Sequence, residues 1–560
     1  MYNLLIGGAA GQGIDTTAAI LEMLLKKSGY NVFTSRDFMS RIRGGHNFSL
    51  IRFGTEIIKS HSNRLDGIIA LNNETVEIHK TELNPKGFIL CDAKIDSDDH
   101  RTIKIDMEGI AKKIGNPKVA GTVAIGAVLK LFSEKIDSVK DVLKSFVKAD
   151  YLDVNIEAIT EGFDVAENRF PHLKGKFSDH MILSGNNALT LGAIASGLKF
   201  YSAYPMSPST SIMEYLASKG VEMDIVVEQA EDEIAAINMA IGASFAGARA
   251  MTGTSGGGFS LMVEGLGLSG MTEIPLVVVD AQRPGPVTGF PTRTEQSDLK
   301  FVISASQGEF PRMVIALRHH EDAFYQTIRA FNIAEKYQIP VIILTDQYLA
   351  DASATIKPFE LDDIDIINPA GKKDYDGEYL RYKLTKDGVS PRLIPGKSRN
   401  FVTADSDEHD ECGWITESAD MRIKMMDKRM IKLDKLKLEL QEPEFIGPES
   451  FDILLLGWGS TYGPIKEAVE ILNKGYGKKP NLKFSALVFG DVYPLPQKLL
   501  KEKAAKASRI VNVEQNATGQ LAGLIREHTG IECTSNILKY DGRQISGEEI
   551  ADRAMEVSFK

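Results

Sequence analysis

A run of acidic residues, Glu228 to Glu233, directly precedes a long segment of Ala, Gly and Ile residues. Acidic side chains are stabilised at the start of a helix by its dipole, so the run can be an ordinary acidic first turn. Glu233, however, abuts the apolar segment, where burial would strip its carboxylate of water unless a partner bound it. The small residues that follow allow another group to pack very close to this helix. Both interpretations of Glu233 stay open at this point.

Hydroxyl and guanidinium groups recur at the ends of apolar runs in the same part of the chain. The loop YPMSPST (Tyr204–Thr210) has two prolines that fix its backbone, so its hydroxyls are held in place and can hydrogen-bond an anion, although the loop alone is more simply a turn. Arg283 follows the apolar run 274–280, and an arginine at the carboxyl end of a strand can bind a carboxylate with two hydrogen bonds. Between them, TGTSGGGFSLM (Thr252–Met262) predicts a strand, a flexible turn and the start of a helix.

A glycine-rich turn, GGAAGQG (Gly7–Gly13), follows the first apolar run and opens a helix. Free backbone N–H groups at such a turn can bind a phosphate. A dinucleotide site is disfavoured, because the next strand ends in Thr34-Ser35-Arg36 and lacks the acid that would bind a ribose. Three arginines near Gly44-Gly45-His46-Asn47 favour a phosphate-bearing ligand instead: Arg36, Arg41 and Arg43. A turn that is only structural explains the glycines equally well.

The sequence predicts no metal site. The acidic run DSDEHDE (Asp405–Glu411) fails as a calcium-binding loop, because His409 and Asp410 stand where an acid or Asn and then a Gly are required. A solvated acidic loop is the simpler interpretation. The number and spacing of the cysteines exclude a disulfide framework, a zinc site made of cysteines and an iron–sulfur cluster bound by this chain alone. They lie far apart in the sequence: Cys91, Cys412 and Cys533.

Composition indicates a globular protein. The 560 residues are 43% hydrophobic and 25% charged, and 65 basic against 76 acidic side chains give a net charge of −11. An acidic chain is a poor partner for nucleic acid. No apolar run approaches the ~18 residues that a membrane span needs, and the N-terminus lacks the basic start of a signal peptide. We therefore expect a cytoplasmic protein without nucleic acid or membrane partners.

Hydrophobic periodicity predicts the α/β elements that must position these residues. In the first block, apolar runs predict strands at 3–6, 30–34, 48–53, 67–71 and 87–91, and helical spacing predicts a helix over 16–27. The second block predicts a parallel sheet with buried strands at 224–227, 248–252, 274–280, 313–317 and 339–345. The last block begins with a strand at 452–456 and returns to α/β alternation.

The region between these blocks, from 357 to 449, is charged and rich in turns, apart from one predicted helix. In that helix Ile423, Met426, Met430 and Leu433 follow a 3-4-3 spacing, which predicts that they face the core. We therefore divide the chain into four segments: 1–178, 181–355, 356–449 and 450–560.

Taken together, these motifs resemble the α subunit of 2-oxoacid:ferredoxin oxidoreductases, in the form that carries a γ domain at its N-terminus. YPMSPST, the run from EQAEDE to GGGFSLM, and RPGPVTGFPT occur in the order and spacing of that family. GGAAGQG and RGGHNFSLIR match the γ domain, LRYKLTKDGVSPRLIPG and DSDEHDE match the middle segment, and VEQNATGQL matches the C-terminal domain. The resemblance spans essentially the whole chain. It implies a multidomain α/β fold: a Rossmann-like γ domain, a pyrimidine-binding thiamine diphosphate domain, the middle segment and a transketolase C-terminal-like domain.

The family binds thiamine diphosphate between two subunits. The resemblance implies that this chain supplies only the pyrimidine side, because it has Gly490-Asp491-Val492 and Asp541-Gly542 but lacks the Gly-Asp-Gly motif that holds diphosphate and Mg²⁺. A β subunit would then carry the Mg²⁺ site and the [4Fe–4S] cluster, ferredoxin would accept electrons, and CoA would be the co-substrate. We expect a dimer of α–β heterodimers.

The resemblance also implies roles for single residues. Glu233 would hydrogen-bond the pyrimidine ring and drive the tautomer shift that activates thiamine. Four residues would bind the 2-oxoacid, with a serine at 207 in place of the commoner threonine: Tyr204, Ser207, Arg283 and Thr292. The cofactor-binding set would comprise two glycines near thiamine and six residues of the CoA-associated γ domain: Gly256, Gly257, Gly8, Gly11, Gly13, Arg36, Arg41 and Arg43.

The implied reaction converts a 2-oxoacid, CoA and oxidised ferredoxin into acyl-CoA, CO₂ and reduced ferredoxin. We favour 2-oxoglutarate, because a fused γ–α chain with a separate partner is common among enzymes that act on it; pyruvate, branched-chain or broad specificity stays open. A thiamine enzyme of transketolase or dehydrogenase type is disfavoured by the γ-like N-terminus. A non-catalytic subunit that binds a nucleotide through GGAAGQG is the alternative from another class.

Overall fold

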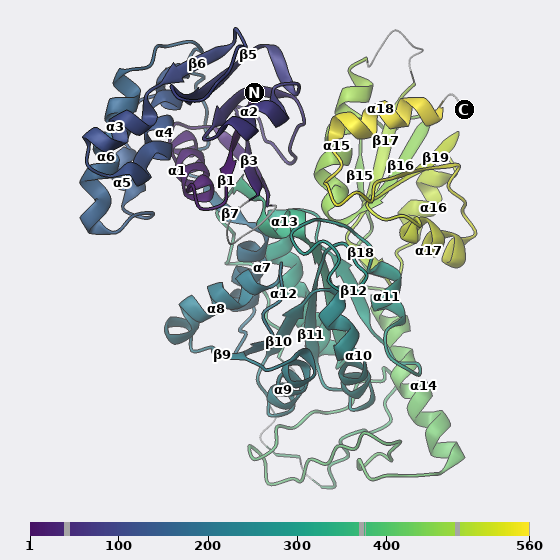
Figure 1. Ribbon diagram of the computed structural model, residues 1–560. Coiled ribbons are helices and arrows are strands. Elements are labelled where there is room, and N and C mark those ends of the chain that lie inside the picture. Colours follow the sequence, from purple (N-terminus) through teal and green to yellow (C-terminus); the bar gives the residue numbers. More distant parts are fainter. Residues whose placement is uncertain (39–44, 369–373, 376, 476–481, 559–560) are drawn as a thin grey trace. The chain divides into compact units, whose positions relative to one another are not determined.

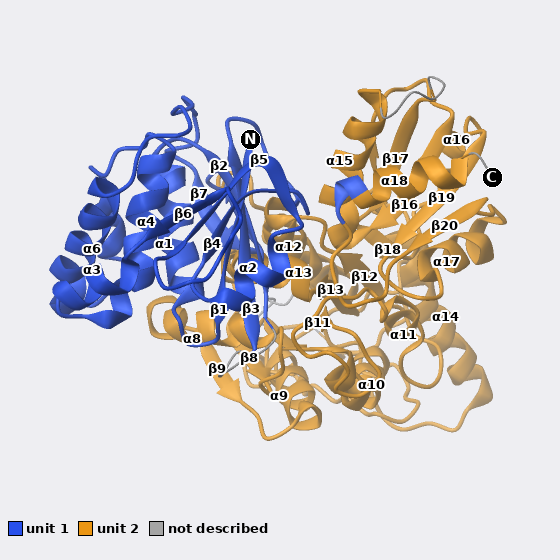
Figure 2. Ribbon diagram, turned by 45° about the horizontal axis from the view of Figure 1, so that its top comes forward, with its two compact units in different colours: residues 1–184, 351–359, 546–548 blue, residues 185–350, 360–545, 549–560 orange. Residues whose placement is uncertain are grey.

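Figure 1 shows the protein as a computed structural model, which describes residues 1–38, 45–368, 374–375, 377–475 and 482–558. The chain forms two compact units (Figure 2). The first comprises residues 1–184, 351–359 and 546–548, and the second comprises residues 185–350, 360–545 and 549–560. Two short segments from later in the chain therefore complete the first unit.

An eight-stranded mixed sheet forms the centre of the first unit. Its order is β6 (Thr102–Ile105), β5 (Leu83–Asp92), β4 (Leu65–Ala70), β1 (Tyr2–Ala9), β3 (His46–Gly54), β2 (Asn31–Asp37), β14 (Ser353–Ile356) and β7 (Met181–Ser184). β1 is parallel to β4 and antiparallel to β3, whereas β14 is antiparallel to both β2 and β7. The five strands predicted for this block correspond to β1 to β5, and those predictions are confirmed.

Helices cover both faces of this sheet because its strands alternate their side chains. Leu4 and Ile6 of β1 face a large core, whereas Leu5 faces a smaller one that contains Val76. The smaller core includes α2 (Asn73–His79). The larger core includes α1 (Ile14–Lys27), α3 (Met107–Lys113), α4 (Ala120–Leu131), α5 (Val139–Leu143) and α6 (Leu152–Asp164).

Glycines allow α4 and α6 to touch backbone to backbone. A Cβ on Gly126 would lie 1.9 Å from the Ile159 carbonyl oxygen, and one on Gly162 would lie 2.0 Å from the Val123 carbonyl oxygen. No larger residue fits at either position without moving a helix.

A seven-stranded sheet organises the second unit. Its order is β18 (Asp491–Tyr493), β12 (Met313–Ala316), β13 (Pro340–Asp346), β11 (Leu276–Gln282), β10 (Ala250–Thr254), β8 (Phe200–Ala203) and β9 (Val226–Gln229). Six of these strands are parallel, and only β18 runs antiparallel to its neighbour β12. Five of the six correspond to the predicted strands, whereas β8 was not predicted, and β9 is largely exposed rather than buried. The carboxyl ends of the parallel strands therefore share one edge, where ligands of open α/β sheets bind.

The helices of this sheet connect its parallel strands. α9 (Glu233–Phe245), α10 (Gly256–Met271) and α11 (Leu299–Ser304) share a core with β10 to β13. α7 (Gly185–Ala195) packs against α12 (His320–Tyr337), and Gly192 permits their close approach. The remaining helices near this sheet are α8 (Thr210–Met223) and α13 (Gln347–Asp351). Within the described residues, no helix is both long and apolar enough to cross a membrane.

The C-terminal segment forms a five-stranded sheet in the same unit. Its order is β15 (Glu444–Ile446), β17 (Phe484–Phe489), β16 (Ile453–Trp458), β19 (Arg509–Glu514) and β20 (Ser535–Leu538), and only β15 is antiparallel to its neighbour. Its helices are α15 (Tyr462–Asn473), α16 (Lys498–Ala504), α17 (Gln520–Thr529) and α18 (Gly547–Ser558). Trp458 and Phe489 belong to the same core as β11 to β13, so the two sheets are packed together.

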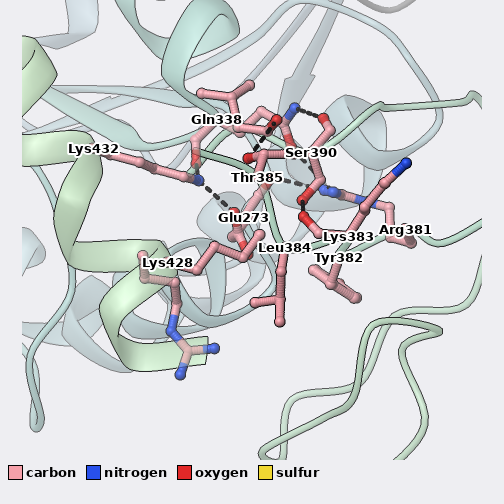
Figure 3. Close-up of polar contacts among 12 residues, drawn as sticks. Glu273, Gln338, Arg381, Tyr382, Lys383, Leu384, Thr385, Ser390, Lys428 and Lys432 are labelled. Atoms are coloured by element: carbon pink, nitrogen blue, oxygen red, sulfur yellow. Dashed lines mark hydrogen bonds and ion pairs between the residues drawn. The ribbon is translucent and has the colours of Figure 1, made fainter. Parts of the chain in front are cut away.

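The middle segment contains α14 (Ala419–Leu436), whose buried face matches the predicted one only in part: Leu433 is buried, and Met426 and Met430 are half-buried. Ile423 is 60% exposed, so the prediction of a core-facing stripe is wrong at this position. The buried face carries the charged residues Lys428 and Lys432, which bind the buried carboxylate of Glu273 (Figure 3). The Lys428 Nζ to Glu273 Oε1 distance is 2.5 Å. A buried counter-ion explains why charged rather than apolar residues face inward here.

Arg381 also joins the middle segment to Glu273. Its guanidinium donates to the Glu273 carbonyl oxygen (2.9 Å) and to Gln338 Oε1 (3.0 Å). We name Glu273, Arg381, Lys428 and Lys432 the charge cluster. All four residues are buried, with at most 4% exposed, and their contacts fix the middle segment within the second unit.

The acidic run at 405–411 is not simply a solvated loop, which corrects the sequence interpretation. His409 is fully buried and its ring centroid lies 3.9 Å from that of Tyr382. Glu408 pairs with Arg429 of α14 (2.8 Å), and Asp410 Oδ1 accepts the Cys412 N–H (2.9 Å). The carboxylates therefore bind the middle segment to itself.

Candidate active site

Glu233 is the first residue of α9, and the preceding Asp232 caps this helix by accepting the Ala235 N–H (2.7 Å). The Glu233 side chain is buried, with 3% exposed, and its Oε1 has no hydrogen-bond partner among the residues that the structure describes. Gly258 lies against this oxygen, since a Cβ there would be 2.3 Å from Oε1. A buried carboxylate oxygen without a donor is costly, so the site fits a ligand that brings one.

The first turn of α10 lies between two acids, the buried Glu233 and the half-buried Asp298. Gly258 contacts Glu233, whereas a Cβ on Gly256 would lie 2.4 Å from Asp298 Oδ2. At Gly257 the nearest atom to such a Cβ would be the Val287 carbonyl oxygen, at 3.3 Å. The two predicted cofactor glycines, Gly256 and Gly257, thus belong to the same turn as the glycine that contacts Glu233. A turn without side chains leaves its backbone open to close approach by a ligand.

Sequence reasoning missed a pair of acids, the buried Asp280 near the end of β11 and the half-buried Asp298 just before α11. Asp280 is fully buried, and within the described chain neither of its oxygens has a hydrogen-bond partner. Burial raises the pKa of Asp280 well above its ordinary range, and the nearby Asp298 raises it further. Burial also raises the pKa of Asp298 to about 6. The signal in the sequence was an acid that ends an otherwise apolar strand, LVVVD.

The structure brings two predicted substrate residues, Ser207 and Arg283, together. Arg283 Nη1 donates to the Ser207 carbonyl oxygen (2.8 Å), and burial lowers the pKa of the guanidinium. The Ser207 loop is also held by Asn186, whose Nδ2 donates to the Pro208 carbonyl oxygen (2.9 Å). Both loops leave the carboxyl ends of parallel strands, β8 and β11. They therefore lie at the edge of the sheet where a substrate site is expected.

The other two predicted substrate residues are less buried. Tyr204 is 41% exposed, and Thr292 is half-buried in loop 283–298, which joins β11 to α11. The tip of this loop faces outward, with Val287 84% and Phe290 57% exposed. All four residues come from two loops at one sheet edge, and their assignment to a substrate stays a prediction.

In the first unit, GGAAGQG forms the end of β1 and the turn that leads to α1. Gly11 and Gly13 have φ angles of +97° and +76°, and a Cβ on either would meet no described atom within 4 Å. Gln12 covers Gly8, because its Oε1 accepts the Ala9 N–H (2.7 Å) and lies 2.7 Å from the place of a Cβ on Gly8. The backbone at Gly11 and Gly13 is therefore open, and a phosphate there stays a prediction.

Arg36 already has partners within the first unit. Its Nη1 donates to the Asp351 carbonyl oxygen (2.7 Å) and to Ser353 Oγ (2.8 Å), and its Nη2 lies 3.3 Å from Glu22 Oε1. These contacts bind the β14 segment beside β2, a role that the sequence did not suggest. The other two predicted arginines, Arg41 and Arg43, lie outside the described residues.

Asp491, in Gly490-Asp491-Val492, is engaged within the protein. Arg329 donates to both of its carboxylate oxygens (2.6 and 2.7 Å), and the Gln441 N–H donates to one of them (2.7 Å). In the part of the chain that the structure describes, no group of three or more His, Cys, Asp or Glu residues could hold a metal ion.

Comparison with known proteins identifies the family. Residues 3–165 match the family model of pyruvate ferredoxin/flavodoxin oxidoreductase, and residues 191–428 match the thiamine-diphosphate-binding model of pyruvate flavodoxin/ferredoxin oxidoreductase. A 2-oxoacid:ferredoxin oxidoreductase α subunit from Sulfolobus sp is 34% identical over 99% of this chain and 96% of its own length. The 2-oxoglutarate synthase subunit KorA of Methanocaldococcus jannaschii is 35% identical over 60% of this chain and 88% of its own.

A solved structure is similar over its full length. It is the 2-oxoglutarate:ferredoxin oxidoreductase from Magnetococcus marinus with 2-oxoglutarate, coenzyme A and succinyl-CoA bound, and it covers 99% of both chains with a TM-score of 0.91 and 32% identity. The predicted multidomain α/β fold is thereby confirmed. The matches favour an oxidoreductase over a transketolase-type enzyme or a nucleotide-binding subunit. The chain belongs to the α subunits of the 2-oxoacid:ferredoxin oxidoreductases and is a subunit of that enzyme.

Proposed function

We propose that this chain forms the pyrimidine side of a shared thiamine diphosphate site, with Glu233 as its catalytic residue. The assembled enzyme converts a 2-oxoacid, CoA and oxidised ferredoxin into acyl-CoA, CO₂ and reduced ferredoxin. The observation that carries the proposal is the buried Glu233 Oε1, which lacks a donor within the described residues and lies beside the glycine turn of α10. An unpartnered acceptor next to a turn without side chains fits a flat heterocycle that carries N–H groups.

Thiamine diphosphate, when bound, supplies the electron sink for the carbanion that remains after CO₂ leaves. The role of Glu233 is to hold a proton at the ring nitrogen of the thiamine pyrimidine, which favours the imino tautomer of that ring. Burial keeps water from competing for this hydrogen bond. The cap that Asp232 provides fixes the first turn of α9 and therefore the position of the Glu233 carboxylate.

Arg283, Ser207, Thr292 and Tyr204 form the proposed substrate-binding set. A guanidinium binds the carboxylate of a 2-oxoacid, and the hydroxyls orient it while CO₂ leaves. We favour 2-oxoglutarate as the substrate, since one relative is named 2-oxoglutarate synthase and the full-length solved relative holds 2-oxoglutarate. Its second carboxylate requires a further cation, which we assign to the partner subunit.

The proposed partner is a β subunit that carries the diphosphate and Mg²⁺ site and a [4Fe–4S] cluster, and passes electrons to ferredoxin. α9 and α10 present apolar side chains to solvent beside the site: Ile234 is 51% exposed, Met239 37% and Leu261 49%. Exposed apolar residues around an incomplete site favour an interface there. We further propose a dimer of α–β heterodimers in the cytoplasm, with CoA bound by the open glycine turn of the γ domain.

The test is Glu233→Gln in the chain co-expressed with its β subunit. Glutamine keeps the shape and a hydrogen bond but cannot share the proton, so we expect 2-oxoacid-dependent dye reduction to fall by on the order of 10²-fold or more. The matched control is Glu231→Gln, two residues away on an exposed side chain, which should keep full activity. Circular dichroism of bound thiamine diphosphate gives a second readout. Activity of Glu233→Gln within a few-fold of wild type would remove Glu233 from the mechanism.

The substrate and the partner are tested on the same preparation. We expect the kcat/KM for 2-oxoglutarate to exceed that for pyruvate and for branched-chain 2-oxoacids, and a preference for any of these would replace our choice. The lone chain should contain no stoichiometric iron and should not reduce ferredoxin. Iron in the lone chain would contradict the assignment of the cluster to the β subunit.

A further inference from the structure

We infer that the C-terminal domain positions the substrate loop 283–298 through a buried amide network, in which Gln296, Gln515, Asn516 and Gln520 act as positioning residues. The inference rests on the proposed function, because that proposal places Arg283 and Thr292 in the substrate site. It gives a role to the motif VEQNATGQL, which the site described above does not use.

Gln296 is the centre of this network. It is fully buried, and both its backbone and its side chain bond to the C-terminal domain. Its N–H donates to the Gln515 carbonyl oxygen (2.7 Å), and its Oε1 accepts the Gln515 N–H (3.3 Å). Its Nε2 donates to the Trp458 carbonyl oxygen (2.9 Å), and its own carbonyl oxygen accepts Asn516 Nδ2 (3.0 Å). These four hydrogen bonds point in different directions, so together they restrict Gln296 to a single position.

Further bonds hold the residues around Gln296. Gln520 Nε2 donates to the Ser297 carbonyl oxygen (2.7 Å), and Gln520 Oε1 accepts the Lys300 N–H (2.8 Å). The Thr294 N–H donates to the Gly542 carbonyl oxygen (3.3 Å). Segment 294–300 is therefore bound at four of its residues to three separate parts of the C-terminal domain.

The side chain of Glu514 holds the amide network in place. This carboxylate is fully buried and accepts Asn516 Nδ2 (2.8 Å), Trp458 Nε1 (3.0 Å) and the Leu521 N–H (2.9 Å). Asn516 Oδ1 accepts the Gly519 N–H (2.8 Å). Because the hydrogen-bonded groups of this network are buried, a displaced amide would leave polar atoms without partners.

The two ends of loop 283–298 differ in how they are held. At one end Arg283 contacts the Ser207 loop, and at the other end the amide network holds Gln296. The tip between them is exposed at Val287 and Phe290. Thr292 lies only four residues from Gln296, so the network sets where its hydroxyl can be. Loss of the network should therefore misplace the substrate-binding groups without altering Glu233.

The experiment compares Asn516→Ala and Gln520→Ala with the control Asn473→Ala in the assembled enzyme. Asn473 also makes two hydrogen bonds to backbone, both to Phe484 (2.8 and 3.0 Å), but these join α15 to β17 within the C-terminal domain. We expect Asn516→Ala to raise the KM for the 2-oxoacid about tenfold with a smaller change in kcat, as for a lost positioning contact. Hydrogen exchange of residues 290–298 should accelerate in Asn516→Ala and, less strongly, in Gln520→Ala. Asn473→Ala should change neither readout.

The outcomes separate this inference from the proposed function. Unchanged exchange at 290–298 in both variants would overturn the inference, and so would faster exchange with a wild-type KM. If the wild-type complex turned over no 2-oxoacid, the proposed function would fail, whereas the exchange comparison would still test whether the network holds the loop. If Asn516→Ala did not fold, Gln520→Ala, which removes only the bonds to Ser297 and Lys300, would decide the matter.

Discussion

The charge cluster and the amide network hold two segments within the second unit by different means. The charge cluster joins the middle segment to Glu273 through three cationic side chains, whereas the amide network joins loop 283–298 to the C-terminal domain through neutral amides. The attraction between buried charges extends over several ångströms and depends on the protonation of the groups. A hydrogen bond from an amide requires a particular direction, and the amide does not titrate. The substrate loop, where direction matters most, is held by the neutral set.

The charge cluster is unbalanced, because one carboxylate faces three cations. Burial alone would raise the pKa of Glu273, but Lys432 and Lys428 hold it below its usual range. Burial lowers the pKa of Lys432 to about 7 in spite of the attraction of Glu273. The cluster therefore depends on Glu273 for its stability and on Lys432 for its response to pH.

Glu273→Gln should have the largest effect on stability. It leaves Lys428 and Lys432 buried without a negative partner, and breaking a buried pair in this way costs about 3–5 kcal/mol. We expect a marked fall in the Tm of the chain measured by calorimetry. The matched control is Glu222→Gln, which removes an exposed ion pair with Lys219 (3.1 Å) and should cost at most about 1 kcal/mol. Equal Tm values for the two variants would contradict the role of the charge cluster.

The pH dependence of the same cluster comes from Lys432. Its pKa is lower in the folded protein, at about 7, than in the unfolded chain, at about 10.4. Between these values the unfolded chain binds more protons, so stability rises with pH, by at most about 1.4 kcal/mol per pH unit. We expect wild type to gain stability relative to Lys432→Met between pH 7 and 9. Asn516→Ala should keep the wild-type slope, and a slope in Lys432→Met equal to that of wild type would exclude Lys432 as its source.

Asp298, at the end of the loop that the amide network holds, should give the opposite slope. Its folded pKa of about 6 lies above the ordinary value, so its contribution to stability is present below about pH 4 and is lost as pH rises to 6. We expect Asp298→Asn to become more stable than wild type across this window, by on the order of 2 kcal/mol, because each unit by which burial raises the pKa corresponds to about 1.4 kcal/mol. Thermal melts at pH 4 and pH 7 measure this, and a constant difference between the two proteins would contradict it.

Sequence patterns predicted those features that depend on nearby residues. Apolar runs predicted β1 to β5 and five of the six parallel strands of the second unit. The small residues after the acidic run predicted the helix that Glu233 begins, whereas the catalytic role of Glu233 stays a prediction. The patterns failed where the partner is distant. Lys428 faces inward only because Glu273, 155 residues earlier, is buried beside it, and Gln296 meets Gln515 across 219 residues. An interpretation based on hydrophobic periodicity assigns charged and amide residues to the solvent-facing side, so it cannot predict such buried pairs.

Tyr382→Phe should have the smallest effect and sharpens the comparison between charged and neutral contacts. The Tyr382 hydroxyl donates to the Thr272 carbonyl oxygen (3.2 Å), but Arg381 Nη2 donates to the same oxygen (3.2 Å). Because the acceptor stays paired and phenylalanine keeps the ring beside His409, the loss should be below about 1 kcal/mol.

The control for this prediction is Tyr379→Phe. The Tyr379 hydroxyl accepts a hydrogen bond from the Leu393 N–H (3.0 Å). The substitution removes this acceptor, and a buried N–H without a partner costs about 1–3 kcal/mol of stability. We expect the Tm to fall further in Tyr379→Phe than in Tyr382→Phe. The reverse order would mean that the neutral Tyr382 hydroxyl itself stabilises the charge cluster. The cationic side chains would then not be enough to hold the middle segment in place.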